Sequence, residues 1–184
     1  MFWTSYNSSG DDGSIIRASM DGWDPSIIVI GLAYPTGIAI DFQSSRLYWA
    51  DDVYNKVQSS NLGGTDIQTV IKLPRGTGTF GIPLHGSRIY CTFGKSKQVQ
   101  SFSMAGQHVR ILHEDTNELE HLTIVSSRSN LPRSRTNPCA HQQCPKLCVL
   151  ARKSFRCVPW EFSWFYFKNS AVLFSFGHAI GPAI

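Results

Sequence analysis

Short runs of alternating apolar and polar residues, separated by turn residues, fill the first two thirds of the chain. The clearest runs are TGIAIDF at 36–42, IQTVIKL at 67–73 and VRILH at 109–113. An alternation of period two places every second side chain on one face of a strand, whereas an amphipathic helix repeats its apolar positions every three to four residues. No stretch shows that helical spacing. The pattern therefore predicts short antiparallel strands joined by turns rich in Gly, Asn and Asp.

The strands recur in three similar units. Each unit opens on an aromatic pair or its remnant, at Phe2-Trp3, Tyr48-Trp49 and Tyr90-Cys91. A polar turn, a second strand that ends near a Gly and a third apolar strand follow in each unit. Further strands are predicted at 36–42, 79–84 and 121–125. The total of twelve strands would make three four-stranded blades, because repeats of about 40–45 residues with four strands each are typical of a β-propeller.

A glycine motif lies between the second and third units. Residues 75–81, RGTGTFG, contain Gly76, Gly78 and Gly81 in the G-x-G-x-x-G spacing. Such a loop binds phosphate only where a helix begins directly after it, and the residues that follow here are a β-rich run with a proline. Gly81 also aligns with Gly37, which begins the corresponding strand of the preceding unit. We therefore interpret the motif as a loop between blades and expect no nucleotide or other cofactor.

Charge and cysteines change after residue 125. Residues 1–125 carry nine Lys and Arg against twelve Asp and Glu, whereas residues 126–157 carry seven basic residues and no acidic one. Four of the five cysteines follow the same break, at Cys139, Cys144, Cys148 and Cys157. Clustered cysteines predict disulfides in a secreted protein and a metal site such as zinc in an intracellular one. The first residues have neither the basic nor the apolar region of a signal peptide.

The aromatic motif carries a family likeness. The sequence resembles the YWTD repeats, or class B repeats, of the low-density lipoprotein receptor family. The motif stands as Phe2-Trp3-Thr4-Ser5, Tyr48-Trp49-Ala50-Asp51 and Tyr90-Cys91-Thr92-Phe93, and a Pro-x-Gly-Leu-Ala-Val-Asp-like strand stands as Pro35 to Asp41. The resemblance implies a YWTD-type propeller over residues 1–126. Propellers of this family have six blades, so three blades correspond to half of a ring.

The cysteine cluster resembles the EGF-like module that follows such propellers. The module would occupy residues 139–157, after a linker at 127–138, and an unassigned hydrophobic tail would occupy 158–184. The resemblance implies pairing of Cys139 with Cys148 and of Cys144 with Cys157. The fifth and sixth cysteines of the family pattern are absent, and the acidic residues of calcium-binding versions are absent too. We expect no metal here, and the disulfides are favoured over zinc.

Most single residues have structural interpretations. We predict that Trp3, Trp49, Tyr48 and Tyr90 form blade core, that Asp51 makes a hydrogen bond between blades, and that Cys91 is a small buried residue that leaves its blade less well filled. Asn7-Ser8-Ser9 is a glycosylation sequon if the chain is secreted. The family uses histidines in acid-triggered release, but His85, His108, His113 and His121 have no assigned role. After Lys168 only 16 residues remain, so no certain membrane span is predicted.

The resemblance implies a non-enzymatic, extracellular module of an endocytic receptor. It would bind protein ligands, such as lipoproteins or other endocytic cargo, or support their pH-dependent release. Alternatives are a Wnt-coreceptor-like module that binds Wnt-pathway proteins, a soluble decoy isoform, and a truncated gene product without function. Sulfated glycans are candidate partners of residues 126–157, and no nucleic acid is expected. Because three blades leave unpaired faces and edges, we predict that the isolated chain is unstable or self-associates.

Overall fold

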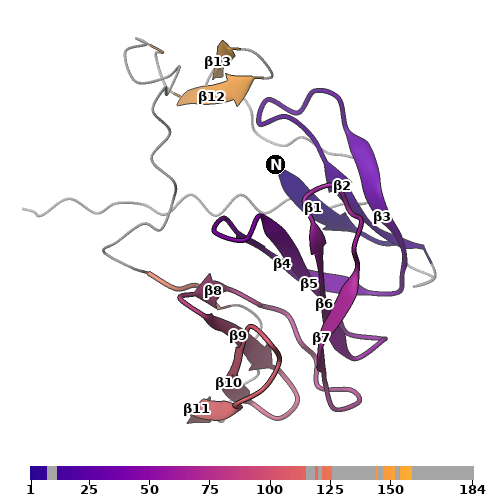
Figure 1. The fold of residues 1–184 in the computed structure, drawn as a ribbon, viewed down its shortest axis with the longest axis vertical. Helices are drawn as coiled ribbons and strands as arrows, with labels where there is room; N and C mark the ends of the chain where they lie inside the picture. The colour runs from indigo at the N-terminus through magenta and orange to yellow at the C-terminus, as the bar shows by residue number, and fades with distance from the viewer. Residues whose placement is uncertain are drawn as a thin grey trace, which may run out of the picture.

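The computed structural model describes residues 1–7, 12–114, 119, 122–125, 144, 147–151 and 154–158. Every regular element in these ranges is a β-strand, which confirms the predicted all-β class (Figure 1). The first sheet contains β1 (Phe2–Ser5), β2 (Gly13–Arg17) and β3 (Ser26–Leu32). The second contains β4 (Pro35–Asp41), β5 (Arg46–Asp51), β6 (Lys56–Asn61) and β7 (Gln68–Lys72). The third contains β8 (Leu84–His85), β9 (Arg88–Phe93), β10 (Gln98–Ser103) and β11 (Arg110–Glu114).

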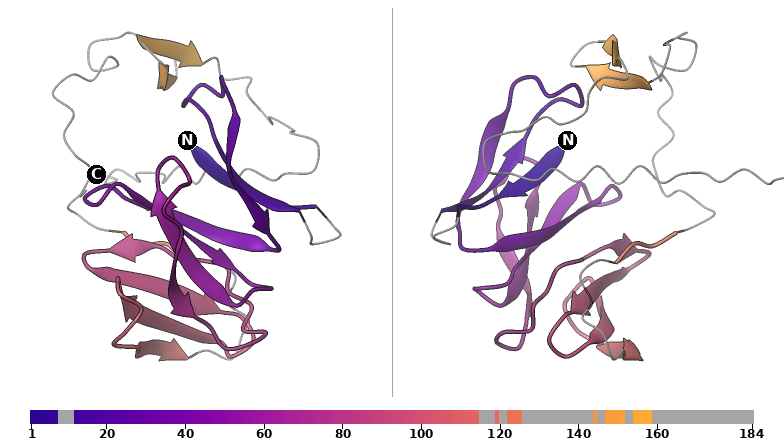
Figure 2. Two further views of the ribbon diagram at one scale, coloured as in Figure 1. Left: turned by 45° about the vertical axis from the view of Figure 1, so that its right-hand side comes forward. Right: turned by 180° about the vertical axis from the view of Figure 1, so that it is seen from behind.

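The three sheets follow one another in chain order around a common inner side. Strands β1 and β4 lie side by side, as do β4 and β8, while β3, β7 and β11 form the outer edges (Figures 1 and 2). Within each sheet every strand pairs antiparallel with its neighbour in the sequence. This arrangement is that of successive propeller blades, and the array is part of a propeller.

The sequence repeat is also a conformational repeat. Gly22, Gly64 and Gly106 are 42 residues apart and have φ angles of 83°, 82° and 74°. Two residues after each glycine, a non-glycine residue also adopts a positive φ: Asp24, Asp66 and His108, at 57°, 55° and 53°. Backbone angles in this region are uncommon outside glycine. Their recurrence shows that the three outer turns have one shared geometry.

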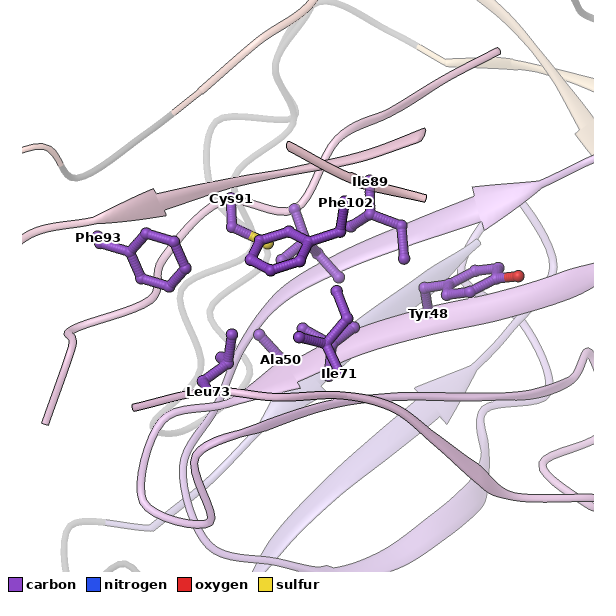
Figure 3. Close-up of a cluster of buried hydrophobic side chains, with 10 residues drawn as sticks. Tyr48, Ala50, Ile71, Leu73, Ile89, Cys91, Phe93 and Phe102 are labelled. Carbon is purple, nitrogen blue, oxygen red and sulfur yellow. The ribbon is translucent and has the colours of Figure 1, made fainter. Parts of the chain in front are cut away.

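Two buried clusters join the sheets. Leu47 and Trp49 of the second sheet pack against Ile15, Val29 and Leu32 of the first. On the opposite side of the second sheet, a larger cluster joins it to the third, and Figure 3 shows its side chains converging from both sheets. Its buried members are Tyr48, Ala50, Val57, Ile71, Leu73, Ile82, Ile89, Cys91, Phe93 and Phe102. Burial of apolar side chains between adjacent sheets is the main force that holds the array together.

Two of the predicted strands are wrong in extent. In 79–84 the structure has only a bridge from Thr79 to Phe93 and the two-residue strand β8. The segment does run beside β9, since Gly81 and Pro83 accept backbone hydrogen bonds from Thr92 and Tyr90. A proline has no N–H to return, so a regular ladder cannot form there. Residues 122–125 are not a strand, and residue 121 lies outside the described residues.

Cys91 is the small buried residue that we predicted in the third sheet. It occupies the position of Trp49 and is fully buried. Phe93 and Phe102 stand on the same face of the sheet and belong to the same cluster, with ring centroids 6.4 Å apart in an edge-to-face arrangement. These two rings pack around the position of the missing indole, and the poorer filling of this sheet stays a prediction.

A separate hairpin follows, formed by β12 (Leu147–Ala151) and β13 (Ser154–Val158). A disulfide joins Cys144 to Cys157, which is the pair that the family resemblance implies. Cys148 is also disulfide-bonded. Cys139 lies outside the described residues, so its pairing with Cys148 stays a prediction. The same holds for the linker at 127–138, for the domain boundaries and for the tail beyond Val158.

Candidate functional site

The aligned aromatic positions are structural. Trp49 is fully buried, and Trp3 and Tyr48 are 8% and 5% exposed, while Phe2 and Tyr90 are half-buried at the edges of the array. Trp49 alternates with the fully buried Asp51 on one face of β5, toward the first sheet. These side chains position the surface of the molecule, and they are not themselves available to a large ligand.

Asp51 is the centre of a buried hydrogen-bond network. Its carboxylate accepts backbone N–H groups from Ala33 at 2.9 Å and from Tyr34 at 3.3 Å, both in the connection between the first and second sheets. It also accepts the N–H of Tyr54 at 3.0 Å, in the turn between β5 and β6. One carboxylate therefore fixes two neighbouring loops, which is the hydrogen bond between blades that we predicted. A buried carboxylate is tolerated because these donors replace its hydration.

The two loops that Asp51 holds carry Tyr34 and Tyr54 to one end of the array. There Tyr34 contacts Tyr6, which lies in the turn after β1. The Tyr6 and Tyr34 rings lie 4.3 Å apart, and their hydroxyl oxygens are 3.1 Å apart, which is hydrogen-bond distance. The hydrogen bond with Tyr6, with contributions from burial and from the negative charges nearby, raises the pKa of Tyr34. Tyr34 therefore stays neutral at physiological pH and keeps its hydroxyl as a donor and acceptor.

Charged and aromatic groups extend this end of the molecule. Tyr54 is 50% exposed, and the Lys56 ammonium lies 4.8 Å from the centre of its ring. The backbone N–H of Asp52 donates to the backbone carbonyl of Tyr34 at 3.0 Å. The Asp52 carboxylate accepts the backbone N–H of Thr79 at 3.0 Å. We call the set Tyr6, Tyr34, Asp52, Tyr54 and Lys56 the tyrosine surface.

The tyrosine surface is not among the sites predicted from the sequence. Tyr6 and Tyr54 stand in the polar turns after the motif strands, and Tyr34 stands directly before Pro35 in the connection to β4. The sequence did contain a usable signal. Loops lie at the protein surface, so the aromatic side chains of three loops cannot all belong to the buried core. What the sequence could not supply is that three turns from two sheets converge.

The glycine motif is not a phosphate site in the structure. Gly76 and Gly78 have positive φ angles of 66° and 65° in the connection between β7 and β8, and no helix follows Gly81 in the described part of the chain. Gly81 lies close to Leu122, and Gly37 lies so close to the backbone of Phe80 that a Cβ would meet its oxygen at 2.7 Å. These glycines allow close approach of chain segments, as the interpretation as a loop between blades requires.

Other candidate groups give no reactive site. Burial raises the pKa of the Cys91 thiol to about 12, so this cysteine is an inert core residue. Cys144 and Cys157 are joined to each other and cannot serve as zinc thiolates. Among the described residues, no group of three or more His, Cys, Asp or Glu side chains could hold a metal ion.

The remaining predicted residues lie apart from the tyrosine surface, with one exception. Asn7 is exposed and follows Tyr6 directly, so the sequon lies beside this surface. His85, His108 and His113 are exposed but do not belong to it, and His121 is outside the described residues.

In the basic segment at 126–157, the Arg156 guanidinium lies 3.8 Å from the Asp21 carboxylate. Within the ranges given above, no helix is long and apolar enough to cross a membrane.

Comparisons with known proteins agree with this architecture. No protein-family model matches the chain. The chain is 29% identical to the vitellogenin receptor of Solenopsis invicta over 86% of its own length, and 32% identical to the vitellogenin receptor Yl of Drosophila melanogaster over 82%. It spans only 9% and 7% of those receptors.

Solved structures match the fold. The array superimposes on a chain of a nidogen/laminin complex with a TM-score of 0.58 and 22% identity, over 65% of this chain and 45% of that one. A gluconolactonase from Xanthomonas campestris matches with a TM-score of 0.51 and 18% identity, over 61% of this chain and 38% of that one. At these identities the matches establish the fold alone.

Proposed function

Because this chain is a YWTD-repeat protein related to the low-density lipoprotein receptor, we propose that it binds protein ligands and that the tyrosine surface is where they dock. The relatives are receptors, and the chain corresponds to a small part of each. The proposal concerns this part and assigns it a binding role without catalysis, since its free thiol Cys91 is buried and inert.

The observation that carries the proposal is the pairing of exposure with fixed geometry. Tyr6 and Tyr54 are 39% and 50% exposed, yet their surroundings are fixed by the ring contact with Tyr34 and by the buried carboxylate of Asp51. Tyrosine is enriched at protein interfaces because one ring offers a large apolar area and a polar tip at low entropic cost. Preorganised aromatic groups are typical binding hot spots.

The chemistry of the surface favours a protein over a small molecule. Its aromatic rings are flanked by a carboxylate, Asp52, and an ammonium, Lys56, so charges of both signs border an apolar centre. An apolar centre with a polar border is the ordinary composition of a protein–protein interface. Vitellogenin is the first ligand to test, because the relatives are named as its receptors.

An extracellular location is part of the proposal. The Cys144–Cys157 disulfide persists in oxidising compartments, and Asn7 is exposed as a glycan acceptor must be. A glycan at Asn7 would stand next to Tyr6 and would border the proposed docking site. Secretion of the chain behind an added signal sequence, followed by enzymatic removal of N-glycans, tests this part by a shift in mass.

The proposal as a whole is tested by binding of vitellogenin to the secreted chain in surface plasmon resonance. We expect the double variant Tyr6→Ala, Tyr54→Ala to weaken binding at least tenfold, since each ring contributes a hot-spot contact of about 1 kcal/mol or more. Phe42→Ala is the matched control, because Phe42 is 49% exposed at the turn between β4 and β5 and lies outside the tyrosine surface. Equal binding by the double variant and the control would reject the tyrosine surface as the docking site.

A further inference from the structure

Two tyrosines at one end of the array lie closer together than aromatic side chains usually do. The Tyr6 and Tyr34 ring centroids are 4.3 Å apart, with an angle of 46° between the ring planes. Aromatic pairs in proteins usually have centroids about 4.5–7 Å apart. The two hydroxyl oxygens are 3.1 Å apart, which is hydrogen-bond distance. The rings therefore converge at their hydroxyl ends.

This orientation brings the reactive carbons of both rings together. When a phenol is oxidised, the unpaired electron is shared between the oxygen and the carbons next to the hydroxyl-bearing carbon, which are the ortho carbons. Because the hydroxyl oxygens are closer to each other than the ring centres are, the ortho carbons belong to the closest part of the contact. Groups that are positioned next to each other react far faster than groups that must first meet in solution. The contact therefore favours bond formation between the rings.

The two tyrosines come from separate segments and are accessible. Tyr34 lies in the connection between the first and second sheets, where the buried Asp51 carboxylate accepts its backbone N–H. Tyr6 lies in the turn after β1, 28 residues earlier in the chain. Tyr6 is 39% exposed and Tyr34 is half-buried, so an oxidant in the solvent reaches the pair in the folded chain. Fixed geometry and exposure together are what a directed modification requires.

The other described tyrosines do not combine these properties. Tyr48 is 5% exposed and belongs to the core between the second and third sheets. Tyr90 is half-buried in β9. Tyr54 is 50% exposed, but the group against its ring is the Lys56 ammonium, which cannot form a bond of this kind. Oxidation of the folded chain should therefore be directed to the pair described above.

We propose that Tyr6 and Tyr34 are a site of oxidative cross-linking, at which a carbon–carbon bond forms between the two rings to give dityrosine. The oxidant is hydrogen peroxide, used by a haem peroxidase that removes one electron and one proton from each phenol. The two resulting radicals combine through one ortho carbon of each ring, and the hydrogens of those two carbons move as protons to the phenol oxygens. The pair loses two hydrogen atoms in total, and one hydrogen peroxide becomes two molecules of water.

The cross-link joins the turn after β1 to the connection that precedes β4. It closes a covalent loop around β2 and β3, between positions 28 residues apart in the sequence. Closing such a loop restricts the unfolded chain, as a disulfide does, so the cross-linked chain should unfold at a higher temperature in a thermal scan. The reaction uses residues of this chain and needs no ligand. The inference therefore does not rest on the proposed function.

The test is treatment of the secreted chain, residues 1–184, with a haem peroxidase and hydrogen peroxide at low protein concentration. After removal of N-glycans, we expect a monomer whose mass is lower by two hydrogen atoms and which shows the fluorescence of dityrosine. Trypsin cuts after Lys and Arg, so the link should join the peptides 1–17 and 18–46. We expect about tenfold more of this product from the folded chain than from the chain in urea, because only the fold keeps the two rings together.

Single phenylalanine variants identify the partners. Tyr6→Phe and Tyr34→Phe keep the ring and its packing but lack the phenol O–H, so each should abolish the link between the two peptides. Tyr90→Phe, a change of the same kind in β9, should cross-link as the wild type does. The inference is overturned if no product forms, if the product joins two chains, or if the link persists in either of the first two variants. Equal yields from the folded chain and from the chain in urea would also overturn it. None of these outcomes depends on whether the tyrosine surface binds a ligand.

Discussion

The second and third sheets share one backbone plan and differ at three buried positions on the face that looks toward the preceding sheet. The second sheet has Trp49, Asp51 and Ser60 where the third has Cys91, Phe93 and Phe102. The second sheet thus combines a large indole with a hydrogen-bonded carboxylate. The third exchanges both for two phenylalanine rings that pack edge to face. The same repeat can therefore be joined to its neighbour through a polar centre or through apolar packing alone.

The difference has a consequence for the surface above it. Asp51 orients Tyr34 and Tyr54 through their backbone N–H groups, so the tyrosine surface forms at the junction of the first and second sheets. Phe93 can accept no such bonds. At the next junction the loop is held from the second sheet instead, by Asn55 accepting the Gly76 N–H at 2.9 Å and by Asp52 accepting that of Thr79. The buried carboxylate therefore fixes the two loops that carry Tyr34 and Tyr54, and the corresponding positions at the next junction are Gly78 and Ser96, which are not aromatic.

The largest loss of stability is expected when Trp49 of the second sheet is replaced by cysteine, the residue at the equivalent position of the third sheet. Trp49→Cys removes a fully buried indole without supplying the rings that compensate in the third sheet. Large-to-small changes of this kind cost about 3–5 kcal/mol. Urea denaturation of the secreted chain measures this as a fall in the free energy of unfolding. A loss below about 1 kcal/mol would mean that a cysteine at this position needs no compensating rings. Phe93 and Phe102 would then not be what compensates for Cys91 in the third sheet.

Removing the buried carboxylate of Asp51 should lower the free energy of unfolding by slightly less. Asp51→Ala leaves the N–H groups of Ala33, Tyr34 and Tyr54 without their acceptor, at about 1 kcal/mol or more for each buried donor, or about 3 kcal/mol together. Phe93→Ala, the matched change in the third sheet, should lose stability without altering the loops. Amide hydrogen exchange distinguishes the two, since only Asp51→Ala should speed exchange at residues 33, 34 and 54.

The reverse exchange in the third sheet should have a smaller effect. Cys91→Trp adds an indole to a cluster that Phe93 and Phe102 already fill, and overpacking typically costs about 1–3 kcal/mol. The triple change Cys91→Trp, Phe93→Asp, Phe102→Ser rebuilds the second sheet's set and should be less destabilised than Cys91→Trp alone. If Cys91→Trp instead stabilises the chain in thermal unfolding, the third sheet contains an unfilled space after all.

The smallest effect is expected at the outer turns, between β6 and β7 and between β10 and β11. Arg46 forms an ion pair with Asp66 at 2.7 Å, and its hydrogen bond holds the pKa of that carboxyl below its ordinary value. The pair therefore contributes above the ordinary pKa of an aspartate and is lost as the pH falls through the lowered value. In the third sheet, Arg88 donates to the backbone carbonyl of His108 and has no carboxylate there.

Carboxyl titration by NMR tests this difference. Arg46→Gln should raise the pKa of Asp66 toward its ordinary value, while Arg88→Gln should leave it unchanged. His108→Asp should create a carboxyl whose pKa is lowered in the same way as that of Asp66. An Asp66 that titrates identically with and without Arg46 would show that the exposed pair contributes nothing in solution, as many surface ion pairs do.

The elements that depend on periodicity were predictable from the sequence, and those that depend on convergence were not. Alternation and the repeated aromatic motif indicate the strands of the three sheets and the buried Trp3, Tyr48 and Trp49. Alternation failed at 79–84, where Pro83 interrupts the ladder although the apolar pattern continues. It could not place Tyr6 beside Tyr34, because that contact depends on the angle between two sheets and on a carboxylate that belongs to a third segment.

Hydrogen–deuterium exchange of the secreted chain with and without vitellogenin tests the docking role of the tyrosine surface most directly. We predict slower exchange with ligand at residues 33–34 and 52–56, the loops that Asp51 holds, and unchanged exchange at 62–67 and 104–109 at the opposite end of the strands. Protection of the 62–67 and 104–109 turns without protection of 52–56 would contradict that role, as would exchange that is the same with and without ligand at every loop.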